Sequence, residues 1–187
     1  GDYGELRGAS VHGWGGEISG GGCQHIAVLR LFTQAEITEV VAWGHPQEAL
    51  EREDDEGLII NGHFQLSNGL SCPVFGQPTP SRGVDILTDD ALVRWDWAPP
   101  AIFQGRDAQG ARIPVDRPYT PLEYPRYTYM GTSVISFLDV VENGGELYIS
   151  GHDLRQSLEA AIAAKYSALW GNVPLKLPLE DRSLTLY

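Results

Sequence analysis

The chain has 187 residues, 42% of them hydrophobic and 20% charged, which fits one folded domain over residues 1–187. Its formal charge is −12, from 13 basic and 25 acidic residues, and phosphate binding needs clustered Lys and Arg, so nucleic acid is disfavoured as a partner. No apolar stretch approaches the roughly 20 residues of a membrane span, and two cysteines, Cys23 and Cys72, make no disulfide framework, so we expect a cytoplasmic protein with no membrane partner.

Short runs rich in β-branched and aromatic residues, bounded by Gly, Pro, Asn or Asp, predict most of the elements in the first two-thirds of the chain. The predicted strands are 6–14, 36–44, 58–66, 70–75, 83–88, 91–97, 101–105 and 111–115. Between two of them, Ser67-Asn68-Gly69 indicates a hairpin with a type I′ turn, because Asn-Gly accepts positive φ. Short connections of this kind favour an antiparallel meander over βαβ crossovers.

Helical periodicity predicts three helices. The first covers 24–33, and the second covers 133–141 and stops at Gly144-Gly145. The third begins at a capping box formed by Asp153 and Gln156. Its predicted core stripe consists of Leu154, Leu158, Ile162 and Leu169. We therefore expect an α+β fold: a large, mostly antiparallel, open-faced β-sheet with helices packed on one face, and the other face left to water or a partner.

Three further segments are expected to lack regular structure. The acidic run at 51–56 is typical of a solvated loop or helix end. The Tyr/Pro-rich segment 118–125 is typical of a long surface connection, and a Pro-bracketed tail covers 174–178. The only methionine is Met130, so we expect the chain to be part of a longer or processed protein.

Glycines cluster between the first strand and the first helix, at 13–16 and 20–22. Their spacing is not the GxGxxG that cradles a pyrophosphate, and the βαβ context is missing, so they indicate a flexible loop. The five histidines are dispersed without an HExxH pair, and no metal is expected. No GxSxG elbow anchors a hydrolase triad.

Gln24 and His25 fall in the first turn of the first predicted helix. Backbone amides at a helix N-terminus favour an anionic or polar group. His25 is placed there for proton transfer to a hydroxyl or carbonyl, and Gln24 for orienting a substrate. The alternative is that His25 is a helix residue packed or hydrogen-bonded for stability.

The order of several motifs resembles that of the glucose–fructose oxidoreductase/inositol dehydrogenase (Gfo/Idh/MocA) family. Its pattern GG…D-x-x-x-H-x-x-D-x-x-R, then "eV.A", is similar to 20–32 followed by 35–42 here. The segment GHFQLSNG at 62–69 looks like its "g.f.l.nG", and 83–92 looks like its "i.I.Gt.G.l". The closing "sG.dgr.slE.a.A.y.S...g..v.LPl" is similar to 150–179.

The family's acid–base positions are only partly matched. Anchored on Leu29 and Arg30, the family histidine falls on Gln24, its preceding aspartate on Gly20 and its following aspartate on Ala27. Glutamine is no general acid or base near neutral pH. A one-residue slip puts His25 in the histidine position. Either His25 serves, or the parent enzyme uses a variant site, or it has lost this chemistry.

The resemblance implies a detached substrate-binding and oligomerisation domain whose parent passes hydride between NAD or NADP and a sugar or polyol carbon. The cofactor would be held mainly by an N-terminal Rossmann domain absent from this chain, with none bound by this chain alone. A homodimer or homotetramer through the sheet face is implied as well. The expected residues are His25 (catalytic) and Gln24, His12, Trp14, Tyr124 and Arg126 (substrate-binding). The rivals are a non-catalytic binding or assembly module and an unrelated sheet-and-helix enzyme.

Overall fold

The computed structural model describes residues 3–97, 100–116, 129–147 and 149–186. These residues form an α+β fold with one large sheet, as expected. The strands are β1 (Leu6–His12), β2 (Ile37–His45), β3 (Ile59–Leu66), β4 (Ser71–Phe75), β5 (Gly83–Thr88), β6 (Ala91–Trp95), β7 (Ala101–Arg106), β8 (Arg112–Pro114) and β9 (Leu175–Lys176). The helices are a π-helix (Ile18–Gly22), α1 (Cys23–Thr33), α2 (Gln47–Leu50), α3 (Tyr129–Asn143) and α4 (Gly151–Leu169).

The strand order is β8-β7-β6-β5-β1-β4-β3-β2-β9, and every neighbouring pair is antiparallel except β1 and β4. The chain forms two meanders, β2 to β4 and β5 to β8. The β3–β4, β5–β6 and β7–β8 turns lie where the turn residues predict, whereas β2 and β3 are joined through α2. β1 lies between them, with Val11 paired to Val74 in parallel and to Val84 in antiparallel register. The mostly antiparallel sheet is therefore confirmed, with one parallel junction at its centre.

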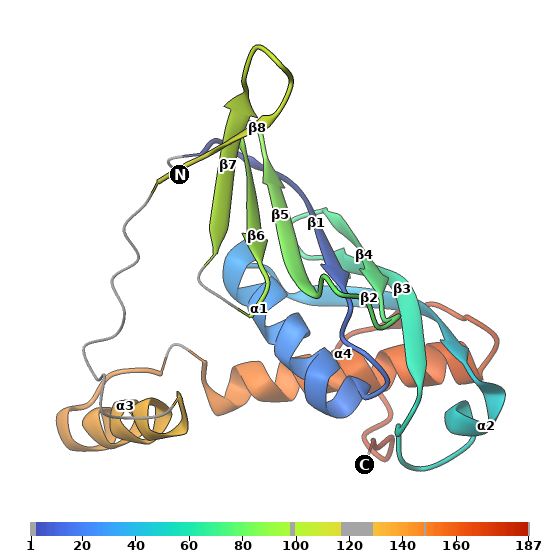
Figure 1. Cartoon of the computed structure of the whole chain (residues 1–187). Coiled ribbons are helices and arrows are strands. Elements are labelled where there is room, and N and C mark those ends of the chain that lie inside the picture. Colours follow the sequence, from blue (N-terminus) through green and yellow to red (C-terminus); the bar gives the residue numbers. More distant parts are fainter. Residues whose placement is uncertain (1–2, 98–99, 117–128, 148, 187) are drawn as a thin grey trace.

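One face of the sheet is covered by α1 and α4, which lie side by side (Figure 1). Side chains alternate between the two faces, so Val40 and Ala42 of β2 are buried while Trp43 is exposed. The buried face carries the core, which includes Phe64, Ile26 and Leu29. Removing such apolar surface from water makes the largest favourable contribution to the stability of the fold.

Helix α4 differs from its prediction in both cap and buried face. Its N-cap is Ser150, whose Oγ accepts from the Asp153 amide while the Asp153 carboxylate accepts from the Ser150 amide, so the capping box starts one turn earlier than predicted. The core side is chiefly a row of alanines; of the predicted stripe, Ile162 and Leu169 pack partly against the core, whereas Leu154 and Leu158 are exposed. Leu154 is 56% exposed, whereas Ala164 is fully buried. Small side chains let the helix approach the sheet closely.

The close approach of α4 also completes the edge of β2. The Ala42 amide donates to Ser167 Oγ at 3.0 Å, and Asn172 Nδ2 donates to the Ala42 carbonyl at 2.7 Å. β9 pairs only with Glu39 and Val40, so these two groups find side-chain partners instead of a neighbouring strand. The predicted irregular tail thus contains a short strand, β9. Beyond the end of β9, side chains at the C-terminal end of α4 bind the backbone groups of β2 that a longer strand would have paired.

Helix α3 lies apart from the sheet in Figure 1, unlike the expected packing of all helices on one face. It ends where predicted, at Gly144, which takes a φ of +76°. Its apolar side chains Val134, Phe137, Leu138 and Val141 are exposed. Periodicity located this helix correctly, but tertiary contacts decide whether an apolar stripe is covered.

The hairpin between β3 and β4 uses a different turn from the predicted type I′. Gly69 has a φ of +87° and its amide donates to the Leu66 carbonyl, while Asn68 keeps a negative φ. The Leu66 amide donates to Leu70, so the loop has three residues with glycine in the left-handed position. The Asn68 side chain instead accepts from the Leu70 amide.

Candidate functional site

The segment after β1 is ordered as a π-helix, where a flexible loop was expected. Gly13 turns the chain with a φ of +73° and lies against Arg82 and Ser81. The chain then enters the π-helix Ile18–Gly22, which continues directly into α1. Ile18 is buried in the core and anchors this turn. Single π-turns are rare and often occur at functional sites.

His25 is held under the sheet by this turn and is only 1% exposed. Its Nδ1 lies 2.7 Å from the Gly21 carbonyl oxygen, so the ring donates from Nδ1. Trp95 and Trp97 pack edge-on to it, with ring centroids 5.7 and 5.6 Å away. Burial lowers the pKa of His25, which keeps the ring neutral near pH 7.

The other ring nitrogen of His25, Nε2, is a buried acceptor with no hydrogen-bond partner in the described parts of the chain. A neutral imidazole protonated at Nδ1 presents a lone pair at Nε2. Such a lone pair can accept a hydrogen bond or a proton from a hydroxyl group. Because the ring is enclosed, a substrate reaches Nε2 only if the covering side chains move.

Trp97 packs against the His25 ring, and sequence reasoning missed it as a site residue. It is 44% exposed and has a φ of +51°, in the left-handed region that a non-glycine residue rarely adopts. The Arg82 guanidinium lies 5.5 Å from its ring centroid, a cation–π distance. The sequence signal was the Trp-Asp-Trp run at 95–97, which only predicted a strand end.

The other sequence-predicted residues lie in different surroundings. Gln24 is exposed at the start of α1, next to the buried His25. Trp14 is buried with its ring 6.4 Å from that of Phe64, so it belongs to the core and has no free face. Tyr124 and Arg126 lie outside the described residues. The structure thus brings His25 and Gln24 together as neighbours on one helix turn.

His12 is the last residue of β1, and its side chain is largely buried. Its Nδ1 is 3.2 Å from the Ser81 carbonyl oxygen, and its Nε2 is 3.7 Å from Asp85 Oδ1. The polar contact with Asp85 raises the pKa of His12 despite its partial burial. Arg94 donates to both Asp85 oxygens, at 2.8 and 2.6 Å. Although burial acts to raise it, these cationic partners hold the pKa of Asp85 far below its usual range.

Asp55, in the acidic run, is 3% exposed, so the expectation of a fully solvated loop is wrong for this residue. Its Oδ2 accepts from the Ser19 amide at 2.6 Å and its Oδ1 from the Ser19 hydroxyl at 3.0 Å. The buried Lys165 of α4 donates from Nζ to the carbonyls of Arg52, Glu53 and Asp54, at 2.5, 3.1 and 2.9 Å. The acidic loop therefore joins α4 to the π-helix.

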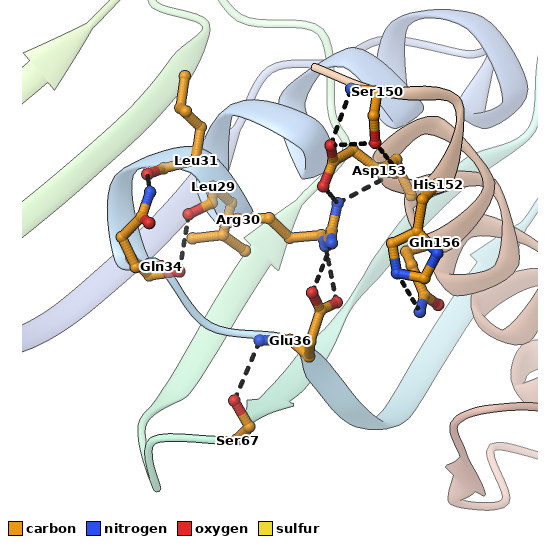
Figure 2. A network of polar contacts seen from close by, with 12 residues as sticks. Leu29, Arg30, Leu31, Gln34, Glu36, Ser67, Ser150, His152, Asp153 and Gln156 are labelled. Atoms are coloured by element: carbon orange, nitrogen blue, oxygen red, sulfur yellow. Dashed lines mark hydrogen bonds and ion pairs between the residues drawn. The ribbon is translucent and has the colours of Figure 1, made fainter. Parts of the chain in front are cut away.

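A second polar network joins the other end of α1 to α4 (Figure 2). The buried Arg30 donates to both Glu36 carboxylate oxygens, at 3.0 and 2.6 Å. Its third nitrogen, Nη1, donates to the Asp153 carbonyl and to Asp153 Oδ1, at 3.0 and 3.2 Å. A cavity of about 230 Å³ adjoins this network and is lined by Ala27, Arg30, Leu31, Gln34, Ala35, Glu36, Ile149 and Asp153. Four hydrogen bonds hold the Arg30 guanidinium between Glu36 and Asp153, so the network orients α1 against α4.

Three further observations concern metal ligands, membrane spans and the cysteine beside Gln24. No three His, Cys, Asp or Glu side chains gather in metal-binding geometry within residues 3–97, 100–116, 129–147 and 149–186. Among the same residues, no helix is long and apolar enough to cross a membrane. Burial raises the pKa of the Cys23 thiol, next to Gln24, to about 12, so it is no ready nucleophile.

Comparisons with known proteins give a fold and no sequence family. No family model matches the chain, and no curated protein matches it in sequence. Solved structures do match. The aldose-aldose oxidoreductase from Caulobacter crescentus, complexed with glycerol, has 18% identity over 95% of this chain and a TM-score of 0.70. The UDP-N-acetylglucosamine 3-dehydrogenase from Acidithiobacillus ferrooxidans has 15% identity over 89% of this chain and a TM-score of 0.66.

The scyllo-inositol dehydrogenase from Lactobacillus casei, with bound NAD(H) and scyllo-inositol, has 17% identity over 94% of this chain and a TM-score of 0.62. These three are Gfo/Idh/MocA-type oxidoreductases, so the resemblance seen in the motifs is confirmed as a likeness of fold. The chain spans 55, 57 and 58% of the lengths of the dehydrogenase from A. ferrooxidans, the oxidoreductase and the inositol dehydrogenase.

Proposed function

From this shared fold we propose that the chain is the C-terminal, substrate-binding domain of an NAD(P)-dependent oxidoreductase acting on a sugar or polyol hydroxyl or ketone. The observation that carries the proposal is the match of nearly the whole chain to little more than half of enzymes whose names describe sugar and polyol oxidoreduction. The remaining part of the parent would be an N-terminal Rossmann domain. Fold alone does not set function, so the site must supply the chemistry.

The cofactor belongs to the proposed N-terminal domain. The sequence of this chain has no GxGxxG after a strand. Its glycine-rich turn is a π-helix whose Gly21 and Gly22 already lie against Trp14 and Ile18. NAD or NADP would accept or donate the hydride. The role of this chain is to hold the substrate at the N-terminus of α1 and to transfer the proton of the reacting substrate hydroxyl.

In this proposal Nε2 of His25 accepts the proton of the reacting hydroxyl, or returns it to a ketone in the reverse direction. Its Nδ1–H bond to Gly21 fixes the tautomer that leaves Nε2 free. Trp97 opens to admit the substrate and stacks on its apolar face. The exposed Gln24 orients a neighbouring hydroxyl, and His12 serves as a further polar contact.

The upstream coding sequence tests the proposal first. We expect a strand followed by GxGxxG within roughly 120–150 residues before Gly1, the length of one nucleotide-binding domain. The parent should then reduce NAD or NADP with a member of a sugar and polyol panel, whereas the 187-residue chain alone should not. If no such domain is encoded there, the enzymatic proposal fails, and a binding or assembly module is the remaining interpretation.

Single substitutions in the parent separate the two neighbouring site residues. His25→Ala should lower kcat by about 100-fold, the usual loss when a general base is removed, with a smaller change in KM. Gln24→Ala should chiefly raise KM. His152→Ala, an exposed histidine at the start of α4 and away from the sheet face, is the matched control and should have parental kinetics. Full activity of the His25 variant would assign the proton transfer elsewhere.

The open sheet face is the proposed oligomer interface. It presents the exposed Trp43, which packs edge-on to His63 at 6.4 Å, and the exposed Phe75. Trp43 and Phe75 both pair with Asn61 of β3, so they lie in one row of this face, and a contiguous exposed apolar patch favours association. We expect a dimer or tetramer in light scattering, dissociating on Trp43→Lys. Val141→Lys, on the similarly exposed α3, should leave the assembly intact. A monomer at all concentrations would refute this interface.

A further inference from the structure

A chain of buried polar contacts runs from α4 to the turn that holds His25. It starts at Lys165, whose ammonium binds three successive carbonyls of the acidic loop. The next residue of that loop is Asp55, whose two carboxylate oxygens both bind Ser19. Ser19 lies within the π-helix, and Gly21 of the same turn accepts from His25. Three segments distant in sequence are thereby linked: α4, the acidic loop, and the π-helix with the start of α1.

The acidic loop also packs directly against the turn through backbone. A Cβ on Gly16 would lie 3.1 Å from the Gly57 Cα, so these two backbones touch. The π-helix has no side-chain cap of its own: its N-cap Glu17 makes no capping hydrogen bond. The charged oxygens that accept hydrogen bonds from Ser19 therefore belong to a residue outside the helix, Asp55. A hydrogen bond to a carboxylate is about twice as strong as a neutral one.

We propose that Asp55 is a positioning residue: clamped by Lys165, it fixes the π-helix so that His25 stays in its enclosed, Nδ1-protonated state. Asp55 touches no reacting atom in this role. Its link to catalysis rests on the proposed function, but its effect on His25 does not. Without the clamp, Ser19 loses its acceptor, the turn relaxes, and water reaches the imidazole ring.

The consequence is a measurable change in the titration of His25. The ionisable groups that face it are His12 and Arg82, which lower its pKa, and Asp96, which raises it, while burial has the largest effect and lowers it. Hydration on loosening of the turn should therefore raise the pKa of His25 towards its ordinary value near 6.5. Loss of the Asp55 negative charge by itself would act in the opposite direction. Weakening of the Gly21 hydrogen bond, which raises the pKa of His25, would also lower that pKa, so it is a rise that separates hydration of the loosened turn from direct electrostatics.

Long-range ¹H–¹⁵N NMR of the histidine rings in the 187-residue chain tests this. In Asp55→Asn the His25 titration midpoint should rise and its Nδ1-protonated signature should weaken. Asp54→Asn is the matched control: the neighbouring carboxylate is exposed and bonded to Arg52, so His25 should be unchanged. Leu66→Ala, in the core of β3, controls for lost stability alone. If Asp55→Asn does not fold, Ser19→Ala removes one of the two bonds.

Two results would overturn the proposal. One is an Asp55→Asn chain that loses stability as Leu66→Ala does but keeps the wild-type titration and tautomer of His25. The other is an equal shift in Asp54→Asn. In the parent enzyme, Asp55→Asn should lower kcat by about tenfold or more with little change in KM, as a slightly misplaced catalytic group does. A parent without oxidoreductase activity would refute the proposed function and leave the NMR test standing.

Discussion

Replacing Lys165 with Met is expected to lower the free energy of unfolding by about 3–4 kcal/mol, because each buried acceptor left unpaired costs about 1–3 kcal/mol and the loop is partly open to rehydration. Three carbonyls, those of Arg52, Glu53 and Asp54, lose their donor at once. For a domain of this size the melting temperature should fall by roughly 6–16 °C.

Chemical and thermal denaturation of Lys165→Met and of a control variant, Lys176→Met, measure this loss of stability. Lys176→Met on β9 is the matched control, since that lysine is exposed and its loss should change stability by less than about 0.5 kcal/mol. Burial lowers the pKa of Lys165, yet three converging acceptors are ligands for the protonated ammonium. Equal stabilities for the two variants would mean that the acidic loop is not fastened to α4.

Replacing Ala164 with Leu is expected to destabilise the chain by about 2–3 kcal/mol, the cost of overpacking a filled core. Ala164 is fully buried on the face of α4 that lies against the sheet. Leu and Ala have similar helix propensities, so the loss reports packing and not the helix itself. The extra methyl groups must push α4 away from β2, which strains the Ser167–Ala42 hydrogen bond.

Leu154→Ala is the reciprocal change on the same helix and should cost less than about 1 kcal/mol, because that side chain is already largely in solvent. Equilibrium unfolding of both variants compares the two faces directly. A larger loss for Leu154→Ala than for Ala164→Leu would restore the leucine stripe as the buried face and contradict the packing of α4.

Local sequence was sufficient where a local rule determines the structure. The β-branched runs located the strands of both meanders to within a few residues, because alternation of side chains over a strand needs no distant information. Gly144 and Gly171, both with positive φ, ended their helices as expected. The motif order that pointed to the Gfo/Idh/MocA fold is of the same kind, a linear pattern along one chain.

The sequence also placed Gln24 and His25 together at the start of α1, since neighbours in sequence stay neighbours in space. It could not tell that one is exposed and the other enclosed. That difference depends on Trp95 and Trp97, which lie about 70 residues after His25 in the sequence. The pairing of β1 with β5 and of β5 with β6 brings them against the His25 ring.

Tertiary structure alone decided the roles of the charged residues and the helix faces. The acidic run looks solvated by composition, yet Asp55 is buried because Ser19 and Lys165, from 36 residues before it and from α4, converge on that loop. Leu154 and Leu158 of α4 look like part of a core stripe, yet both are exposed, and alanines form most of the buried face. Composition and period rank how readily a side chain leaves water; which surface closes over it depends on the space available between packed elements.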